Sequence, residues 1–373
     1  MNILFVDTIY WNYTPDTVYE RPFGGHQSGV CYLTESLGKL GHKVALMNHV
    51  DQPTVARGVM CIPMMHEGER LIALFQEFSP DVVVVVAGAE VAVQLKTILP
   101  ATVPTVLWSG HGYYQAHYKP LEDPLCREAW DAFAFVGTWQ LKTVCERFGL
   151  DKAKAVNLGM AISPKFENLF SSAEEMVAVK TSYPTMLYAS TPERGLSELL
   201  RWFPRLKANH TSARLEVYSS LKVYQLAEAD DPFKGLYELC QRTDGVDYIG
   251  SVPQPELATC MRRSWVLAYP NTVPETACIV AMEAMASGAW PVTSVLGALP
   301  ETTAGFGSLI DAGLRTKEYE DAFVERVDTY IEHLLGGNSK SVQRTWEMVQ
   351  YANANYVWSR RAKQWEQFLG RLL

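Results

Sequence analysis

The chain has 373 residues, of which 48% are hydrophobic and 20% charged, a profile typical of a soluble globular protein long enough for two domains. Its 41 acidic and 33 basic residues give a net charge of −8, which disfavours nucleic acid or a strongly anionic membrane surface as the main partner. This balance leaves open a peripheral, partly apolar membrane contact.

No apolar run reaches the length of a transmembrane helix. The apolar segment 2–6 is short and lacks a basic leader, so we expect a first strand there and not a signal peptide. Seven cysteines are scattered singly without a Cys-x-x-Cys pair, which favours free thiols and a cytoplasmic location. His117 and the run 66–69 have no partners at metal-ligand spacing, so no zinc site is expected.

Alternating strand and helix patterns fill the first half of the chain. Five consecutive valines at 82–86 are typical of a parallel strand buried on both faces. A helix is predicted over 30–40, closed by Gly41. The strands expected in this half are residues 3–7, 43–47, 81–86, 103–108, 132–136 and 155–157.

A second series of strands follows a break in periodicity at 163–182, where a short helix is expected over 173–180. Its strands are predicted at 184–188, 215–218, 246–249, 265–269 and 290–293, and the tail 345–373 reads as helical and rich in aromatic residues. Two such series predict an α/β protein with two parallel sheets, each covered by helices on both faces.

The segment from Tyr269 to Gly288 is the most informative. A helix is predicted to begin near Thr276 and to end at Gly288. Every side of this helix is apolar except for Glu283, so we expect the helix to be buried. A carboxylate in such a helix needs hydrogen-bonding partners.

Glu275 lies just before this helix, where free N–H groups of Ala277, Cys278 and Ile279 would form an anion site. If the intervening chain is helical, Glu275 and Glu283 stand on the order of 12 Å apart along the axis. That separation suits one ligand held at two points, with a diphosphate between them. The alternative is that Glu283 forms a structural buried ion pair and Glu275 is an exposed loop residue.

The stretch 269–301, with both acids and the run Trp290-Pro-Val-Thr-Ser-Val-Leu-Gly-Ala-Leu-Pro-Glu301, resembles the Glu-x7-Glu signature of family-4 (group 1) glycosyltransferases of the GT-B fold. The resemblance implies that Glu275 contacts donor-sugar hydroxyls, that Glu283 binds the ribose and that the intervening N–H groups hold the diphosphate. The family often has a glycine-containing Phe-Gly or Ser-Gly after the first acid, whereas this chain has Thr276-Ala277-Cys278. The donor-binding residues implied here are Glu275, Thr276, Ala277, Cys278, Ile279 and Glu283.

An upstream element, residues 187–200, resembles the family's G-R-x4-K-G-x3-L-L pattern. Aligned through Gly195, Arg194 takes the lysine position and Ser190 stands where an arginine is common. Arg194 is thereby implied to stabilise the leaving diphosphate, because a guanidinium binds phosphate oxygens in a bidentate manner. The alternative is a solvated loop arginine.

The turn at Gly24 and Gly25 resembles the family's GG-x-x loop, which faces the donor phosphates and the acceptor, although a tight connection is the simpler explanation. The connection 8–23 that leads into it is long and rich in Tyr and Trp, and we expect it to form an acceptor wall. Thr138 and the segment 157–160 resemble further family elements.

His111 follows a buried strand and resembles the family's histidine near the donor sugar and acceptor; a satisfied structural histidine is the alternative. Val252 lies in a segment that resembles the family's base-binding loop, where backbone groups would hold the base. An ordinary strand-to-helix turn explains that segment equally well. The predicted catalytic residues are His111, Arg194 and Glu275.

The resemblance implies a GT-B fold with two facing Rossmann-like domains. Residues 1–165 would bind the acceptor, residues 180–345 would bind the donor, and a C-terminal helix at about 350–373 would cross back to the first domain. It further implies a retaining, metal-independent glycosyltransferase without a cofactor. The expected partners are a UDP-, GDP- or ADP-linked sugar and a glycan, lipid or small-molecule acceptor.

Three functions other than glycosyl transfer are alternatives. A nucleotide-sugar epimerase on the same fold stays open, and so does a non-catalytic nucleotide-sugar-binding module, because Ser190 replaces one of the two usual cations. A phosphorylase would require a pyridoxal-binding lysine in a recognisable setting, and none is evident.

Overall fold

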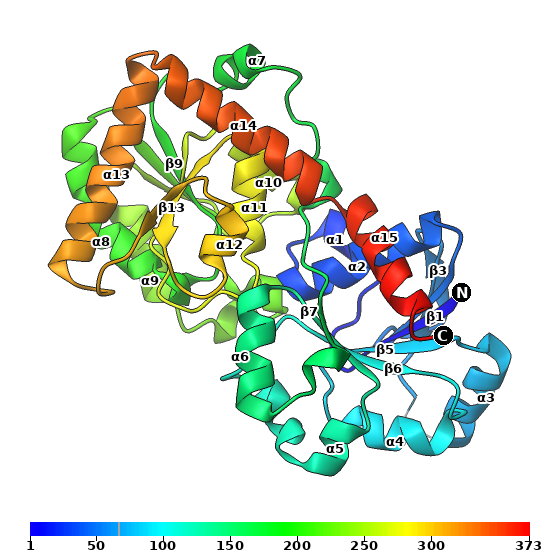
Figure 1. Cartoon of the computed structure of the whole chain (residues 1–373). Helices are drawn as coiled ribbons and strands as arrows, with labels where there is room; N and C mark the ends of the chain where they lie inside the picture. Colours follow the sequence, from blue (N-terminus) through cyan, green and yellow to red (C-terminus); the bar gives the residue numbers. More distant parts are fainter. Residues whose placement is uncertain (66–67) are drawn as a thin grey trace. The chain divides into compact units, whose positions relative to one another are not determined.

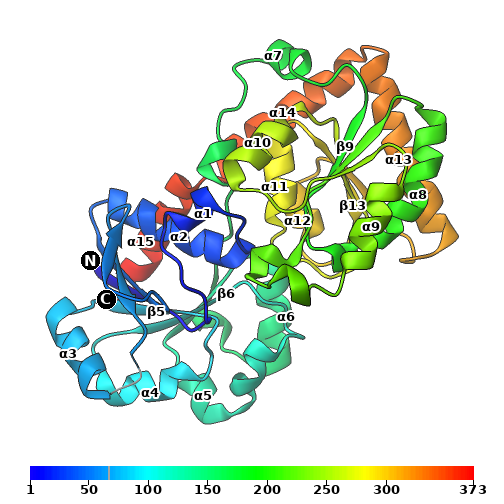
Figure 2. The ribbon, with the colours of Figure 1, turned by 180° about the vertical axis from the view of Figure 1, so that it is seen from behind.

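The structure is a computed structural model that describes residues 1–65 and 68–373. The chain forms two compact units (Figures 1 and 2). The N-terminal unit comprises Met1–Val18, Gly25–Met160 and Trp358–Leu373, and the C-terminal unit comprises Tyr19–Gly24 and Ala161–Val357. Each unit contains one sheet, so the predicted α/β fold with two parallel-sheet domains is confirmed.

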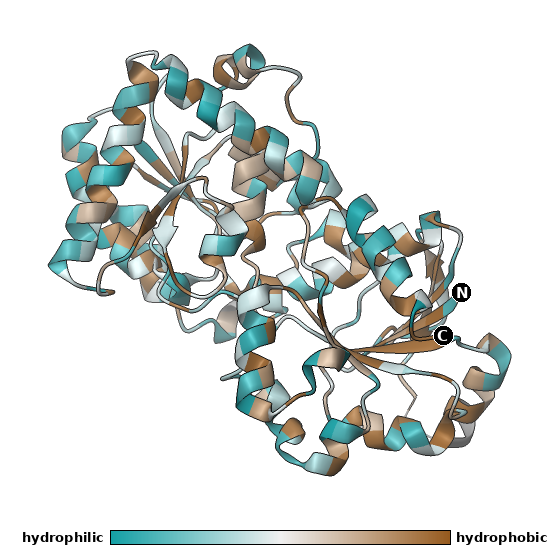
Figure 3. Cartoon of the chain, in the orientation of Figure 1, coloured by the Kyte–Doolittle hydropathy of each residue, from teal (hydrophilic) through white to brown (hydrophobic). Residues whose placement is uncertain are grey.

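The N-terminal sheet has the order β3-β4-β2-β1-β5-β6-β7-β8, and it is parallel except for the β3–β4 pair. All five valines of β5 are fully buried, as their pattern predicts. The central strands are hydrophobic and the helices carry hydrophilic turns (Figure 3). The strands are β1 Asn2–Asp7, β2 Lys43–Asn48, β3 Thr54–Ala56, β4 Val59–Pro63, β5 Val82–Val86, β6 Thr105–Ser109, β7 Ala132–Phe135 and β8 Ala155–Asn157.

The C-terminal helix α15 (Trp358–Gly370) belongs to the N-terminal unit and packs on α2 (Gly25–Lys39), which confirms that it returns to this unit. Trp365 is fully buried, with its ring 5.0 Å from that of Trp108 on β6. The other helices of this unit are α3 Gly68–Phe78, α4 Val91–Ile98, α5 Pro124–Glu128, α6 Thr138–Phe148 and the 3-10 helices η1 Ala116–Glu122 and η2 Lys152–Lys154; α1 Thr17–Glu20 has residues in both units.

The C-terminal sheet is parallel throughout, in the order β11-β10-β9-β12-β13-β14. Numbered from its first strand, this is 3-2-1-4-5-6, the order of dinucleotide-binding sheets. The direction of winding reverses between β9 and β12, which defines the topological switch point. The strands are β9 Thr185–Tyr188, β10 Arg214–Val217, β11 Val246–Tyr248, β12 Val266–Tyr269, β13 Trp290–Ser294 and β14 Ser308–Ile310.

The helices of the C-terminal unit cover both faces of its sheet. The predicted buried helix is α11, in which residues 281–286 are all buried. The set comprises α7 Ala173–Ala178, α8 Leu196–Asn209, α9 Lys234–Arg242, α10 Gln254–Arg263, α11 Ile279–Ala286, α12 Leu299–Thr303, α13 Lys317–Leu335 and α14 Ser339–Asn355.

Three strands were not predicted from the sequence: β3, β4 and β14. The hairpin of β3 and β4 turns at Arg57 and Gly58, which both have positive φ (50° and 80°), as a two-residue turn between twisted strands requires. Arg57 in the first turn position hides this signal in the sequence. Helix α2 begins at Gly25, five residues earlier than expected.

Candidate active site

Two loops meet at the switch point of the C-terminal sheet. One follows β9 and carries Ser190 and Arg194, and the other follows β12 and carries Glu275. Because β9 and β12 are adjacent parallel strands, their carboxyl ends lie at the same edge of the sheet. Arg194 and Glu275, which are 81 positions apart in the chain, therefore come into contact.

Arg194 and Glu275 form an ion pair in which Arg194 Nη1 donates to Glu275 Oε1 at 2.5 Å. The Tyr269 hydroxyl, from the end of β12, donates to the same oxygen at 2.5 Å. Ser190 Oγ lies 3.4 Å from the Tyr269 oxygen. One network thus joins three predicted site residues through a tyrosine that the sequence interpretation missed.

Each member of the ion pair uses only part of its hydrogen-bonding capacity. Within the described residues, the remaining N–H groups of Arg194 and the Oε2 atom of Glu275 have no protein partner. The Arg194 side chain is 26% exposed. The site therefore presents cationic donors beside a carboxylate acceptor.

The positive charge of Arg194 is stable. The Glu275 carboxylate raises the pKa of Arg194 well above its usual range, so the guanidinium stays protonated. Glu275 is only 8% exposed. The alternatives of a solvated loop arginine and an exposed loop acid are therefore both wrong.

Two glycines allow the loops to approach. A Cβ on Gly195 would lie 2.2 Å from the carbonyl oxygen of Pro270, and a Cβ on Gly297 would lie 2.2 Å from that of Glu275. Both glycines have positive φ, 109° and 63°. Glu275 pairs with Gly297 as an isolated parallel bridge, which holds the acid in extended backbone.

The helix after Glu275 begins at Ile279, not near Thr276 as predicted. Cys278 precedes it in the left-handed conformation, with φ 44° and ψ 71°, and residues 276–277 form a bend after the bridge at Glu275. Thr276 is half-buried, and Ala277 and Cys278 are buried. The 12 Å helical separation of the two acids therefore does not apply.

The donors at the start of α11 shift accordingly. Within the described part of the chain, the N–H groups of Ile279 and Val280 make no hydrogen bond. Across residues 1–65 and 68–373 the N–H groups of Ala277 and Cys278, which precede the helix, make no hydrogen bond either, so all four groups are available as donors. The positive end of α11 favours an anion there.

Glu283 lies inside α11 and is 3% exposed. Its Oε1 accepts from the backbone N–H of Ser163 at 3.4 Å, and among the described residues no Lys or Arg forms an ion pair with it. The alternative of a structural ion pair is therefore wrong. Burial raises the pKa of Glu283 to about 8.

The remaining predicted donor-binding residue of this unit is Val252, which is half-buried in the loop between β11 and α10. Gly25 is the first residue of α2 in the N-terminal unit, whereas Gly24 groups with the C-terminal unit. The roles of these residues stay predictions.

His111 follows β6 in the N-terminal unit, in a small cluster of histidines. Its ring stacks on His117 with centroids 3.6 Å apart and stands 5.8 Å from His26. Its Nδ1 lies 3.2 Å from Ser109 Oγ. Burial, reinforced by His26 and His117, lowers the pKa of His111 to about 2, so this imidazole is neutral at physiological pH.

Asp7, at the end of β1, is a second polar residue that the sequence interpretation missed. It accepts from the Tyr13 hydroxyl at 2.6 Å and from Gln27 Nε2 at 3.3 Å. Burial raises its pKa to about 6. The sequence does carry a signal for this residue, because an acidic residue at the end of a continuous apolar strand indicates a polar group at the edge of the sheet.

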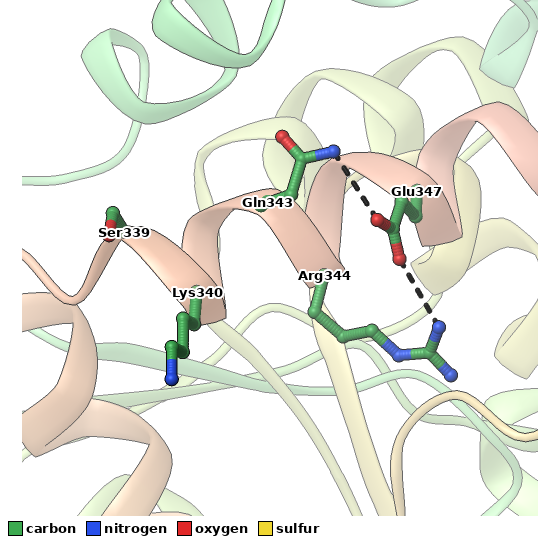
Figure 4. Close-up of a pocket in the computed structure, with 5 residues that line it drawn as sticks. All are labelled: Ser339, Lys340, Gln343, Arg344 and Glu347. Atoms are coloured by element: carbon green, nitrogen blue, oxygen red, sulfur yellow. Dashed lines mark hydrogen bonds and ion pairs between the residues drawn. The ribbon is translucent and has the colours of Figure 1, made fainter.

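A hollow of about 500 Å³ lies on α14 (Figure 4). Its lining residues come from one helix, and Glu347 accepts from both Gln343 (3.3 Å) and Arg344 (3.2 Å). It contains no predicted site residue, so we do not assign it a function. The lining residues are Ser339, Lys340, Gln343, Arg344 and Glu347.

No group of three or more His, Cys, Asp or Glu is placed to hold a metal ion in residues 1–65 and 68–373. Of the run 66–69 noted in the sequence, His66 and Glu67 lie outside the described residues. The same described ranges contain no helix that is long and apolar enough to span a membrane.

Residues 177–334 match the family model described as "Glycosyl transferases group 1". The matched residues lie wholly within the C-terminal unit. This match contains the whole network at the switch point together with α11. No curated protein matches the sequence.

The chain is similar over nearly its full length to several solved structures. A glycosyltransferase from Rickettsia africae superposes with a TM-score of 0.76 at 12% identity, covering 99% of this chain and 98% of that one. Sucrose-phosphate synthase from Thermosynechococcus elongatus gives 0.70 at 16% identity, with 99% and 98% covered. Anabaena HepE in complex with UDP gives 0.70 at 13%, with both chains fully covered. The predicted GT-B fold is thereby confirmed.

Proposed function

We propose that this protein is a retaining, metal-independent glycosyltransferase that transfers a sugar from a nucleotide diphosphate donor to an acceptor. The proposal rests on the ion pair of Arg194 and Glu275 at the switch point of the C-terminal sheet. Within the described residues, the other N–H groups of Arg194 and Oε2 of Glu275 have no protein partner. The pair offers donors for a diphosphate and, beside them, an acceptor for sugar hydroxyls.

Arg194 would bind the diphosphate through the N–H groups that Glu275 leaves unused, and Ile279 and Val280 would add backbone donors. Negative charge on this group increases as the bond to the sugar breaks, so fixed donors stabilise the transition state more than the ground state. The permanent charge of Arg194 supplies what a metal ion provides in other transferases.

Glu275 would accept donor-sugar hydroxyls through Oε2, while Glu283 would bind the ribose. Oε1 of Glu275 already accepts from Arg194 and Tyr269, which makes this carboxylate a poor nucleophile. This favours a front-side reaction. The acceptor oxygen bonds to the anomeric carbon, the bond to phosphate oxygen breaks on the same face, and the acceptor proton passes to that phosphate oxygen.

The N-terminal unit would bind the acceptor, with neutral His111 as a hydrogen-bonding group and not a proton donor. Solved structures of the same fold are described as complexes with UDP and UDP-glucose, and another with ADP and acarbose. They support a nucleotide sugar as the donor class. Seven free, buried cysteines support a cytoplasmic location.

The test begins with thermal shifts against UDP, GDP and ADP and their common sugars. With the stabilising donor, we expect free nucleoside diphosphate to be released on addition of acceptor, with EDTA making no difference, and the product to keep the anomeric configuration of the donor. Glu275→Gln, which preserves the size of the side chain, should lose this release. A donor converted to its epimer without nucleotide release would point to an epimerase, and tight binding without turnover to a binding module.

A further inference from the structure

Three aromatic side chains gather where β6 and β7 of the N-terminal sheet end. Tyr113 and Tyr114 lie in the loop after β6, and Trp139 is the second residue of α6, which follows β7. The Tyr113 ring lies 5.5 Å from Tyr114 and 6.1 Å from Trp139, centroid to centroid. Tyr113 is 38% exposed and Tyr114 50%. We call these three residues the aromatic platform.

A buried side chain fixes the platform from beneath. Gln140, next to Trp139, is fully buried. Its Nε2 donates to the carbonyl oxygens of Ser109 and His111, each at 2.8 Å, and its Oε1 accepts from Val136 N–H at 2.8 Å. One amide therefore ties the loop after β6 to the start of α6, so the backbone that carries the rings is fixed before any ligand binds.

The loop itself is shaped for its second tyrosine. A Cβ at Gly112 would lie 2.5 Å from the Tyr114 ring, so only a glycine lets this ring lie against the loop. The Gly112 N–H donates to Gln115 Oε1 at 2.6 Å, which closes the turn.

The two segments that carry the platform are polar and contain no charged side chain. Residues 110–117 and 137–140 contain no Lys, Arg, Asp or Glu. Exposed amide and hydroxyl groups stand nearby: Gln115 is exposed, and Asn157 Nδ2 donates to Thr138 Oγ1 at 3.0 Å. A ligand bearing phosphate or carboxylate would find no cation on these segments, whereas hydroxyl groups would find partners.

We propose that the aromatic platform binds a pyranose ring of the acceptor, so that the acceptor is an uncharged carbohydrate or carries one. This inference rests on the proposed function. One face of a pyranose presents C–H groups that pack on an aromatic ring, while its hydroxyls form hydrogen bonds at the rim. Because Gln140 also holds the backbone of His111, a sugar on the platform lies beside the predicted catalytic histidine.

The platform is tested by saturation-transfer NMR of the full chain with three probes: methyl β-D-glucopyranoside, methyl β-D-galactopyranoside and methyl α-D-mannopyranoside. We expect at least one probe to receive saturation at its ring protons, and the signal to be lost in Tyr113→Ala and Trp139→Leu. Leucine preserves apolar packing at the half-buried position 139. The matched control is Tyr183→Ala, a tyrosine 40% exposed in the C-terminal unit, which should keep the signal.

Three results would overturn the inference, and the first two are the absence of transfer to all three glycosides and a signal that survives both platform substitutions. The third uses uridine as a probe in place of the glycosides. If Tyr113→Ala and Trp139→Leu lose saturation transfer to uridine and not to a glycoside, the rings bind a nucleobase and the inference is overturned. The thermal shift with UDP, GDP and ADP in the same variants separates this inference from the proposed function. Glycoside binding without nucleotide binding would refute the transferase and leave the platform standing, and the reverse result would refute the platform alone.

Discussion

The two sheets share one strand order but differ in what their switch points carry. In the N-terminal sheet, β4-β2-β1-β5-β6-β7 repeats the 3-2-1-4-5-6 order of the C-terminal sheet. Its switch point holds Asp7, a buried carboxylate that accepts from Tyr13 and Gln27, and within the described residues no Lys or Arg pairs with it. The C-terminal switch point holds Arg194, paired with Glu275 through one nitrogen and open at the others.

The strand order determines where on each sheet a ligand binds, and the side chains at that point determine which ligand binds. A carboxylate without a cation gives a diphosphate nothing to bind, so the N-terminal switch point suits neutral groups. A guanidinium with unused donors beside the start of a buried helix suits an anion. The proposed division of donor and acceptor between the units agrees with this difference in charge.

The largest expected effect is on catalysis. Replacing Arg194 with Ala should lower kcat by about 10²–10³, because it removes the cationic donors from the departing diphosphate. Arg194→Lys should recover part of the rate, because lysine restores the positive charge but not the bidentate hydrogen bonding of a guanidinium. Nucleotide release under saturating donor measures both. Asp7→Asn, at the other switch point, is the control and should stay near the wild-type kcat; equal losses in Asp7→Asn and Arg194→Ala would remove the distinction between the two sites.

The second largest expected effect is a loss of folding stability when a side chain is added at Gly297, which lies against the backbone of Glu275. Gly297→Ala should destabilise the C-terminal unit by about 3 kcal/mol or more, because its φ is 63° and its Cβ would lie 2.2 Å from the Glu275 carbonyl oxygen. Gly305→Ala is the matched control, with φ 82° and no atom within 4 Å, and should cost only about 1 kcal/mol. Urea midpoints decide, and similar losses in the two variants would show that this close approach is not fixed.

A pH-dependent effect comes third, from Glu283. Its pKa of about 8 in the folded protein lies above the ordinary value of 4.5, so the folded state binds more protons than the unfolded state between these values. Stability is therefore lost as pH rises from about 5 to 9, by on the order of 4 kcal/mol. Glu283→Gln should remove this loss, and melting temperatures at pH 5 and 9 should converge in the variant more than in the wild type. Parallel pH profiles would contradict the buried, unpaired state of this acid.

The smallest expected effect concerns the start of α11. Cys278 adopts a backbone conformation that favours glycine, with φ 44°. Cys278→Gly should therefore change stability by less than about 1 kcal/mol, because relief of strain offsets the lost side chain. Ala281→Gly, at a fully buried helical position of α11, gains no such relief and should cost more. A greater loss in Cys278→Gly would show that the strain is not present.

The sequence predicted the architecture because its signals are local. Continuous apolar runs such as the valines of β5 identify a buried strand without knowledge of its neighbours, and their alternation with helices implies parallel sheets. The hairpin of β3 and β4 was missed because Arg57 occupies a position of positive φ where glycine or asparagine is usual.

The candidate site was predicted in its members but not in its geometry. The resemblance identified Arg194 and Glu275, yet their pairing depends on the adjacency of β9 and β12. The start of α11 was misplaced because it depends on a bridge between Glu275 and Gly297, which is a tertiary contact. The sequence predicts Tyr269 only as the end of a strand, because nothing local shows where its hydroxyl points.

The central claim is that the switch point of the C-terminal unit binds a diphosphate through Arg194. Calorimetric titration of UDP, GDP and ADP into the wild-type protein and Arg194→Gln tests it most directly, with the matching nucleosides as references. We predict that the wild type binds one diphosphate more tightly than its nucleoside and that Arg194→Gln removes most of this preference. An unchanged preference in Arg194→Gln would contradict the account.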